Sequence, residues 1–368
     1  MKIETTQEKL AKALNIVSRV AMGSRNTLPI LNNVLIKVNK KKVSLTTTNL
    51  DMAVVDYLPV SKSEDGEITV PARLLAEFIS NLPKGEVIKI SSKDTKVKIE
   101  AGKYSSVMNG SLSDDFPELP DINEKEAVKF KISADEFKNG LNQVIIASSN
   151  DLTRPALTGV FFNSNDGKLF VAATDGYRLA EKKLVDKIND EVAVIIPTPS
   201  LQEVLRCIGE ETEEIEVLLD ESQARFRLGE TEITSKLIDG SFPNYRQLIP
   251  KENSSVVVLN KEELMRVTKL AALFAKEVGG SIVCEAKADK KVFSVASIAN
   301  EYGENDSEIE AEIEKDDKVT LNSRFLIDAL NSLSENTVRF GFSGALSPVV
   351  IRNNKKQDYT HIIMPLKG

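Results

Sequence analysis

The sequence predicts an α+β protein made of three tandem copies of one domain, each with two helices and a mostly antiparallel sheet. Three observations carry this prediction: anchor segments repeat along the chain, each copy has helical apolar stripes, and alternating strand patterns fill the rest. A chain of 368 residues has room for two to three domains of ordinary size. We place the domains at residues 1–122, 123–251 and 252–368, with polar, proline-flanked linkers between them.

The repeat is clearest between the first two copies. Residues 27–35 align with residues 153–161, and the same offset carries Pro71 onto Pro197 and Phe116 onto Phe242. A fainter third copy aligns residues 321–330 with residues 70–79, both with Arg in the fourth place. Copies of this length are too long for solenoid repeats, which leaves closure into a ring as one arrangement that the sequence allows.

Each copy opens with a short strand followed by a helix start. The capping boxes begin at Thr5, Ser133 and Asn260, with a carboxylate three residues on. In the first copy we expect helices over residues 7–20 and 71–82. Their apolar stripes are formed by Leu10, Leu14 and Val17, and by Leu74, Leu75, Phe78 and Leu82.

Alternating and β-branched segments predict the strands. They span residues 34–38, 41–45, 87–91 and 96–100 in the first copy, and 161–162, 169–171, 215–218 and 224–228 in the second.

The composition argues against an enzyme. The chain has one histidine and two cysteines, Cys207 and Cys284, which we interpret as free thiols rather than metal ligands. It has none of the glycine-rich phosphate loops, nucleophile elbows or zinc-binding helices that mark common active sites. Acidic pairs such as Asp114-Asp115 and Asp316-Asp317 fit solvated loops better than catalysis. We therefore expect no catalytic residue, no metal and no cofactor.

No apolar run reaches the ~18–20 residues of a membrane span, and the N-terminus lacks the apolar core of a signal peptide. These features predict a cytoplasmic protein without a membrane partner.

Charge is distributed unevenly between the predicted helices and the rest of the chain. The chain has a net charge of −7, which usually argues against DNA binding. The six predicted helices (7–20, 70–84, 133–147, 199–209, 260–276 and 321–333) contain 12 Lys and Arg residues against 8 Asp and Glu residues, for a net charge of +4. Helices that line a shared surface would make it mildly basic, which suits weak, non-specific backbone contact. Helices are also often rich in lysine, so this excess alone leaves the interpretation open.

Four motifs resemble the bacterial DNA polymerase III beta subunit family, the sliding clamps. They are Thr-Leu-Pro-Ile-Leu at 27–31, Ala-Thr-Asp-Gly-Tyr-Arg-Leu-Ala at 173–180, Gly-Ser-Phe-Pro-Asn-Tyr-Arg at 240–246 and Met-Pro-Leu at 364–366. The resemblance covers essentially the whole chain. It implies the DNA clamp fold and a head-to-tail homodimer that closes into a ring around double-stranded DNA without sequence specificity. Because a closed ring holds DNA by topology, the acidic charge is no obstacle.

The resemblance also implies a hydrophobic pocket that binds short peptides of the replicative polymerase, the clamp loader and other proteins. By matching motif it comprises Arg154, Leu157, Thr174, Gly176, Tyr177, Arg178, Leu179, Pro243, Leu248, Leu346, Ser347, Ile362, Met364, Pro365 and Leu366. We call this set the predicted peptide patch. Met and Leu adapt to varied apolar anchors, and Arg178 can pair with a peptide carboxylate or carbonyl.

Simpler interpretations of these residues remain open. Leu157, Leu179 and Leu248 also fit a plain core, and residues 174–176 also fit a hairpin turn. The first copy has Thr-Asn-Leu-Asp-Met at 48–52, without the Gly and the Arg, which favours a function specific to the second copy. Pro155 and Ala156 stand where many members of the family carry bulkier residues, which suggests a wider subsite, and Tyr177 replaces a common His.

For DNA we expect Arg25 and then Arg73 to face the duplex. For the dimer seam we expect Leu273 and Phe274 to meet Val107 and Met108 of the other protomer. The resemblance implies a non-catalytic processivity factor in DNA replication. The alternatives are a monomeric peptide-binding scaffold and a carboxylate-dependent hydrolase, for which no single-copy acidic cluster is visible.

Overall fold

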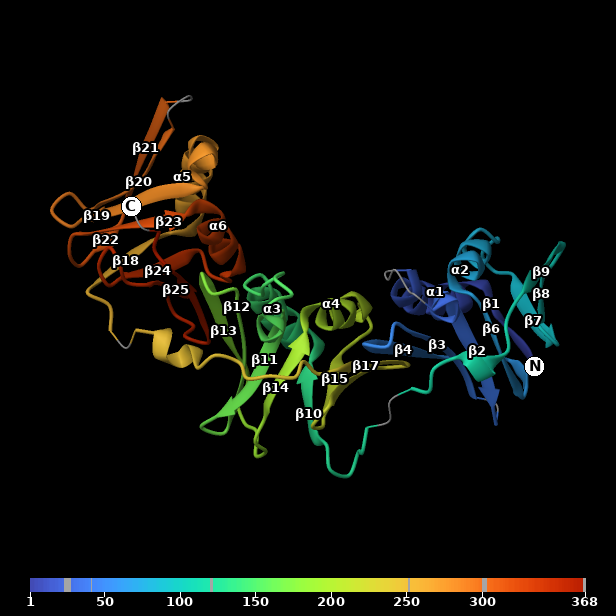
Figure 1. Cartoon of the computed structure of the whole chain (residues 1–368). Helices are drawn as coiled ribbons and strands as arrows, with labels where there is room; N and C mark the ends of the chain where they lie inside the picture. Colours follow the sequence, from blue (N-terminus) through green and yellow to red (C-terminus); the bar gives the residue numbers. More distant parts are fainter. Residues whose placement is uncertain (23–27, 41, 120–121, 251, 300–302, 367–368) are drawn as a thin grey trace. The chain divides into compact units, whose positions relative to one another are not determined.

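The computed structural model describes residues 1–22, 28–40, 42–119, 122–250, 252–299 and 303–366. These residues form two compact units, Met1–Asp135 with Pro199–Leu237, and Glu136–Thr198 with Ile238–Gly368. In its described part, each unit has one large and one small antiparallel sheet with helices packed against them (Figure 1). No helix among these residues is long and apolar enough to cross a membrane.

The order of elements repeats three times along the chain. Each copy runs strand, helix, four strands, helix and three strands, with one short extra strand in the first and third copies. The six helices are α1 (Gln7–Met22), α2 (Ala72–Ser80), α3 (Ala134–Ile145), α4 (Thr198–Cys207), α5 (Lys261–Phe274) and α6 (Ser323–Ser332). The predicted α+β class, threefold repeat and six helices are confirmed, with bounds shifted by a few residues.

The first unit contains two sheets. The smaller has the order β5-β1-β7-β8-β9 and the larger β10-β15-β16-β17-β4-β3-β2-β6. Their bounds are β1 Lys2–Thr6, β2 Asn33–Asn39, β3 Lys42–Thr48, β4 Met52–Leu58, β5 Lys62–Glu64, β6 Gly66–Pro71, β7 Val87–Lys93, β8 Lys96–Ala101, β9 Tyr104–Asn109, β10 Val128–Ser133, β15 Glu214–Leu219, β16 Gln223–Leu228 and β17 Thr231–Lys236. The pairing of β4 with β17 joins strands of the first and second copies.

The second unit repeats this plan. Its larger sheet has the order β14-β11-β12-β13-β26-β25-β24-β18-β22 and its smaller sheet β21-β20-β19-β23. Their bounds are β11 Gly159–Asn165, β12 Lys168–Thr174, β13 Arg178–Val185, β14 Ala193–Pro197, β18 Ser255–Asn260, β19 Ser281–Lys287, β20 Val292–Ala299, β21 Gly303–Glu310, β22 Glu312–Ile313, β23 Asp317–Asn322, β24 Thr337–Phe342, β25 Val349–Asn353 and β26 Tyr359–Ile363. The compact units thus divide the second copy between them, and the three domain boundaries remain a prediction.

The helices bury apolar stripes, with one correction. Leu10, Leu14 and Val17 of α1 are buried as predicted. On α2 the buried face is Ala72, Leu75, Ala76 and Ile79, whereas Leu74 is 52% exposed. The buried positions 72, 75, 76 and 79 follow the i, i+3, i+4, i+7 spacing of one helix face, and position 74 falls outside that face. Leu74 is therefore a surface residue.

The side-chain cap predicted at Asn260 is confirmed. Asn260 accepts hydrogen bonds from the backbone N–H groups of Glu262 and Glu263, which stabilises the first turn of α5. In the first copy, α1 begins at Gln7, and the carboxylate of Glu8 accepts from the N–H of Gly85 at 2.7 Å. Hydrogen bonds from the backbone N–H of Glu8 itself and from that of Gly85 hold the pKa of the Glu8 carboxyl below its usual value. Glu8, the acidic residue of this predicted capping box, therefore holds the loop at Gly85 next to the start of α1.

Candidate peptide-binding and DNA-facing sites

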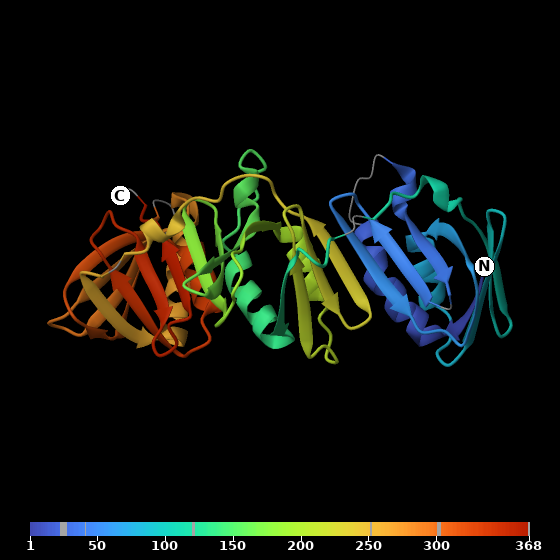
Figure 2. The same cartoon turned by 90° about the horizontal axis from the view of Figure 1, so that it is seen from below.

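Strand pairing inside the second unit brings together parts of the predicted peptide patch that are far apart in sequence. Strand β13 pairs with β26, so that Leu179 lies opposite Ile362 and Arg178 opposite Ile363. Figure 2 shows this junction as a green strand beside red ones. Residues nearly 200 positions apart therefore share one face of a continuous sheet.

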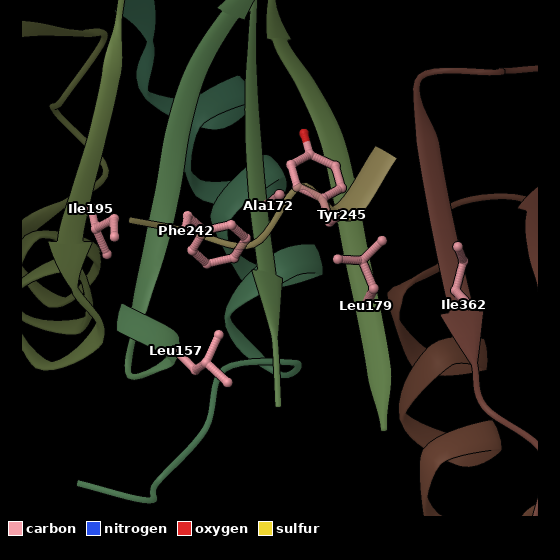
Figure 3. Close-up of a cluster of buried hydrophobic side chains, with 7 residues drawn as sticks. All are labelled: Leu157, Ala172, Leu179, Ile195, Phe242, Tyr245 and Ile362. Carbon is pink, nitrogen blue, oxygen red and sulfur yellow. The ribbon is translucent and has the colours of Figure 1, made fainter. Parts of the chain in front are cut away.

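A cluster of buried apolar side chains forms the floor of this face (Figure 3). Its members are Leu157, Ala172, Leu179, Ile195, Phe242, Tyr245 and Ile362. Three of them, Leu157, Leu179 and Ile362, belong to the predicted peptide patch. The ring of Phe242 stacks on Phe161 with centroids 4.8 Å apart and meets Tyr245 edge-on at 6.0 Å. Such contacts stabilise aromatic pairs beyond their burial, so the floor is rigid.

Several predicted patch residues are exposed apolar side chains. Tyr177 is 62% exposed, Leu248 47% and Leu346 80%. Met364, Pro365 and Leu366 are half-buried. The N–H of Met364 donates to the carbonyl of Tyr177, and that of Leu366 to the carbonyl of Thr320, both at 2.8 Å, so this segment is held in place. Large exposed apolar side chains beside a rigid apolar floor are typical of a protein interaction site.

The turn at Thr174–Arg178 has an exact structural counterpart in the first copy. The Thr174 hydroxyl donates to the Arg178 carbonyl at 2.6 Å and accepts from the Gly176 N–H at 3.1 Å. Thr48 makes the same two bonds, at 2.8 Å to Met52 and 3.1 Å from Leu50. Gly176 has φ +92° and Leu50 φ +75°. The turn is therefore required by the fold in both copies, and Leu50 tolerates a conformation that suits glycine. The missing glycine in the first copy therefore does not indicate a function specific to the second copy, and only the missing counterpart of Arg178 still does.

Arg178 is engaged within the protein. Its Nε lies 3.1 Å from Asp175 and its Nη1 2.6 Å from Asp328 of α6. The guanidinium also lies over the ring of Phe325, 4.6 Å from the centroid, and the side chain is only 11% exposed. These contacts fix the turn against α6. Arg178 thus supports the shape of the patch, and a peptide would meet a guanidinium that is already partly neutralised.

The remaining patch residues lie at its margins. Arg154 is half-exposed, pairs with Asp151 at 3.1 Å, and extends its Nη1 to within 3.3 Å of the position of a Cβ at Gly176. Thr174 is buried and Pro243 is exposed. Leu346 and Ser347 lie in the turn between β24 and β25, strands of the same sheet.

Residues that the motif comparison missed include Phe242, Tyr245 and Ile195 of the floor and Leu152, which is 83% exposed. The Phe-Pro-Asn-Tyr motif at 242–245 could have indicated Phe242 and Tyr245.

The opposite face of the same strands holds the only histidine of the chain. His361 is fully buried, and its Nδ1 lies 2.9 Å from the Tyr359 hydroxyl, which in turn lies 3.2 Å from the Gln143 carbonyl. Burial, with a smaller contribution from the positive charge of Arg178, lowers the pKa of His361 to about 3. The imidazole is therefore neutral at ordinary pH, and this residue is structural.

The basic surface expected for DNA is weaker than predicted. Arg25 lies outside the described residues, and Arg73 is an exposed residue of α2 that pairs with Glu77 at 2.8 Å. With the helix bounds of the structure, helices contain 10 Lys and Arg residues against 8 Asp and Glu residues. Exposed helical cations with no ion pair among the described residues are Lys9, Lys138, Arg266, Lys269 and Arg324. The DNA-facing roles of Arg25 and Arg73 stay predictions.

The predicted dimer residues divide into exposed and buried ones. Leu273 and Val107 are each 58% exposed, and Phe274 is half-buried. Met108 is only 5% exposed because its side chain points into the first unit from β9. Successive strand residues face opposite sides, so Val107 and Met108 cannot both face a partner. Val107 remains the candidate.

Within the part of the chain that the structure describes, no group of three or more His, Cys, Asp and Glu side chains could hold a metal ion. Cys284 is a buried free thiol and Cys207 a half-buried one. Burial raises the pKa of each thiol to about 12, which makes both poor nucleophiles.

The fold and the patch together define a three-domain clamp protein of the DNA clamp fold. Family models of the DNA polymerase III beta subunit match residues 1–120 (N-terminal domain), 131–244 (central domain) and 246–367 (C-terminal domain). The beta sliding clamp of Synechococcus elongatus is 30% identical over 100% of this chain and 99% of its own. The chain therefore belongs to the DNA polymerase III beta subunit family, the beta sliding clamps.

Solved structures agree with this assignment. The DNA polymerase sliding clamp of Bacillus subtilis superposes with a TM-score of 0.94 at 28% identity, covering 100% of this chain and 99% of that one. The Pseudomonas aeruginosa clamp bound to griselimycin also gives a TM-score of 0.94 at 28% identity, with full coverage of both chains.

Proposed function

We propose that this chain is a DNA sliding clamp that closes as a head-to-tail homodimer around double-stranded DNA. It tethers the replicative polymerase, the clamp loader and other proteins through short hydrophobic peptides. In this proposal it is a non-catalytic, cytoplasmic processivity factor without a cofactor. The observation that carries the proposal is the pairing of β13 with β26, which sets a rigid apolar floor beside exposed apolar side chains.

The peptide patch suits an extended segment with apolar anchors. Its floor is buried and preformed, so little ordering of the protein opposes binding. Its margin combines Tyr177, Leu248 and Leu346 with Met364, whose flexible thioether adapts to different side chains. Such a surface is suited to several partners in turn.

The ends of the two smaller sheets support ring closure. Among the described strands, β9 is one of the two edge strands of the first and β21 one of the two edge strands of the second. An open edge carries unpaired backbone groups that readily accept another strand. Strand β21 carries four carboxylates (Glu304, Asp306, Glu308 and Glu310). Strand β8, beside β9, carries Lys96 and also Lys98, which pairs with Glu100 of the same strand at 2.7 Å. Pairing β9 of one protomer with β21 of the other would satisfy both edges with complementary charge, and would bring Val107 toward the apolar end of α5.

Ring closure explains how an acidic protein holds DNA. The net charge of −7 and the slight excess of helical cations are too weak for tight phosphate binding. A closed ring does not depend on such affinity, and weak contacts let the ring slide.

The rival proposal, a monomeric peptide-binding scaffold, makes the opposite prediction for assembly. We expect sedimentation velocity to show a dimer for the native chain and a monomer for Leu273→Glu and for Val107→Glu. The matched control is Leu346→Glu, which places the same charge at an exposed leucine of the peptide patch, in the turn between β24 and β25, rather than at the proposed seam. A native chain that sediments as a monomer at micromolar concentration would favour the scaffold.

A further inference from the structure

We propose that Arg339 and Arg352 form an anion subsite beside the apolar floor, which takes a carboxylate of the bound peptide. This inference rests on the proposed peptide-binding function and names a specificity of that same surface. The subsite lies on strands β24 and β25, which the motif comparison did not include except at their connecting turn.

The position of the subsite follows from strand register. Leu179 lies opposite Ile362, which lies opposite Val350 of β25. Arg352 lies two residues further along β25 than Val350. Its side chain is on the same face of the sheet as that of Val350, because successive side chains of a strand point to opposite faces. Arg352 lies opposite Arg339 of β24. A row of guanidiniums therefore lies about 7 Å from the apolar row that contains Ile362.

The two arginines are directly opposite each other and are not neutralised. Like charges opposite each other on adjacent strands destabilise a sheet. The Nε of Arg352 donates to the Thr360 hydroxyl at 3.1 Å. Within the described ranges, neither guanidinium makes an ion pair. Burial lowers the pKa of Arg352, the charge of the nearby Glu181 partly opposes this effect, and the charge of Arg339 adds to it.

The nearest carboxylates do not cancel this charge. Glu181 lies opposite Thr360 in the same row, but it accepts from the Tyr245 hydroxyl at 2.5 Å and pairs with Arg246 at 3.2 Å. On the other side, Val258 lies between Arg339 and Glu312.

A third arginine adds to the positive charge of this row. The guanidinium of Arg246 lies 4.5 Å from the ring centroid of Phe170, and its Nη2 is buried without a hydrogen-bond partner. Three guanidiniums thus face one carboxylate, which leaves the row with a net positive charge.

The ligand chemistry follows from this arrangement. A carboxylate can accept from both Arg339 and Arg352 and so relieve their repulsion. An extended peptide advances about 3.3 Å per residue, so an acidic residue two positions from an anchor on Ile362 reaches the guanidinium row. We therefore assign the subsite to an Asp or Glu side chain placed two residues from an apolar anchor.

The test compares two fluorescent peptides on the full chain by anisotropy. Both peptides contain one Leu-Phe anchor. In the first peptide an Asp stands two residues before and two residues after the anchor, and in the second peptide Asn replaces both Asp residues. Charged hydrogen bonds of this kind correspond to roughly tenfold tighter binding of the Asp peptide, or more. We expect Arg352→Gln to abolish this preference. Arg352→Glu, which can pair with Arg339 and keeps the sheet stable, should reverse it.

The control variant is Lys290→Gln, which removes one exposed positive charge from the turn between β19 and β20 and should keep the native preference. Equal binding of both peptides by the native chain would overturn the subsite and leave the peptide patch standing. Binding of neither peptide would overturn the patch together with the subsite. Affinity for a DNA duplex that falls in Arg352→Gln, without any peptide preference, would assign the arginines to phosphates and overturn the proposal.

Discussion

The single histidine gives the most sharply defined prediction of stability. His361 is fully buried with a pKa lowered to about 3, against about 6.5 in an unfolded chain. Its neutral form is favoured in the folded state, so its contribution to stability is complete above pH 6.5 and is lost as pH falls toward 3. The loss is about 1.4 kcal/mol per pH unit in that window. Between pH 7.5 and pH 5.0 it amounts to about 2 kcal/mol.

The variant His361→Gln cannot titrate, so it isolates this contribution. Urea unfolding followed by circular dichroism would give the free energy of unfolding of both proteins at pH 7.5, 6.5, 5.5 and 5.0. We expect the native chain to be more stable at pH 7.5 and its advantage to shrink by about 2 kcal/mol at pH 5.0. Carboxylates titrate in both proteins and cancel in the difference. The control Tyr359→Phe keeps the histidine and should keep the native pH dependence. A difference between the native chain and His361→Gln that stays constant over this range would refute the reasoning.

Three further outcomes follow from the geometry of the peptide patch. Met364→Ala with Leu366→Ala should weaken peptide binding roughly tenfold or more, since several buried methylenes are lost, while sedimentation still shows the dimer; unchanged affinity would contradict the patch assignment. Asp328→Asn should lower the free energy of unfolding by roughly 1–3 kcal/mol, because it leaves the nearly buried Arg178 with a weaker partner; thermal unfolding matching the native chain would contradict this. Gly176→Ala should cost about 1 kcal/mol and Leu50→Gly should stabilise, because both positions have positive φ; equal urea midpoints for all three proteins would contradict the shared turn.

Much of the fold could be predicted from the sequence because it depends on local periodicity. The helices and the repeated strand order follow from apolar patterns that each copy carries within itself. The miss at Leu74 shows the limit of this approach, since adjacent leucines on a helix leave the direction of the core undecided. Met108 shows the same limit for a strand.

The candidate site required long-range pairing as well. Leu179 and Ile362 are each apolar strand residues, and nothing local indicates that they lie opposite each other. The family resemblance placed Leu179 and Ile362 in one site. It did not indicate Arg352, whose importance depends on the strand register that puts it opposite Arg339. The hydrogen bonds around Leu50 likewise show that residues 48–52 form the same turn as residues 174–178. The sequence did not indicate this, because Leu50 stands where the second copy has Gly176.

The most direct test of the sliding-ring account is the behaviour of the loaded protein on circular DNA. The chain would be loaded by its cognate clamp loader onto nicked circular DNA and passed through a sizing column in high salt, before and after the circle is cut. The account predicts that the protein stays with the circle and is lost from the linear DNA, because only a closed ring is retained by topology. Loss from both forms in high salt would mean ordinary electrostatic binding and would contradict the sliding ring.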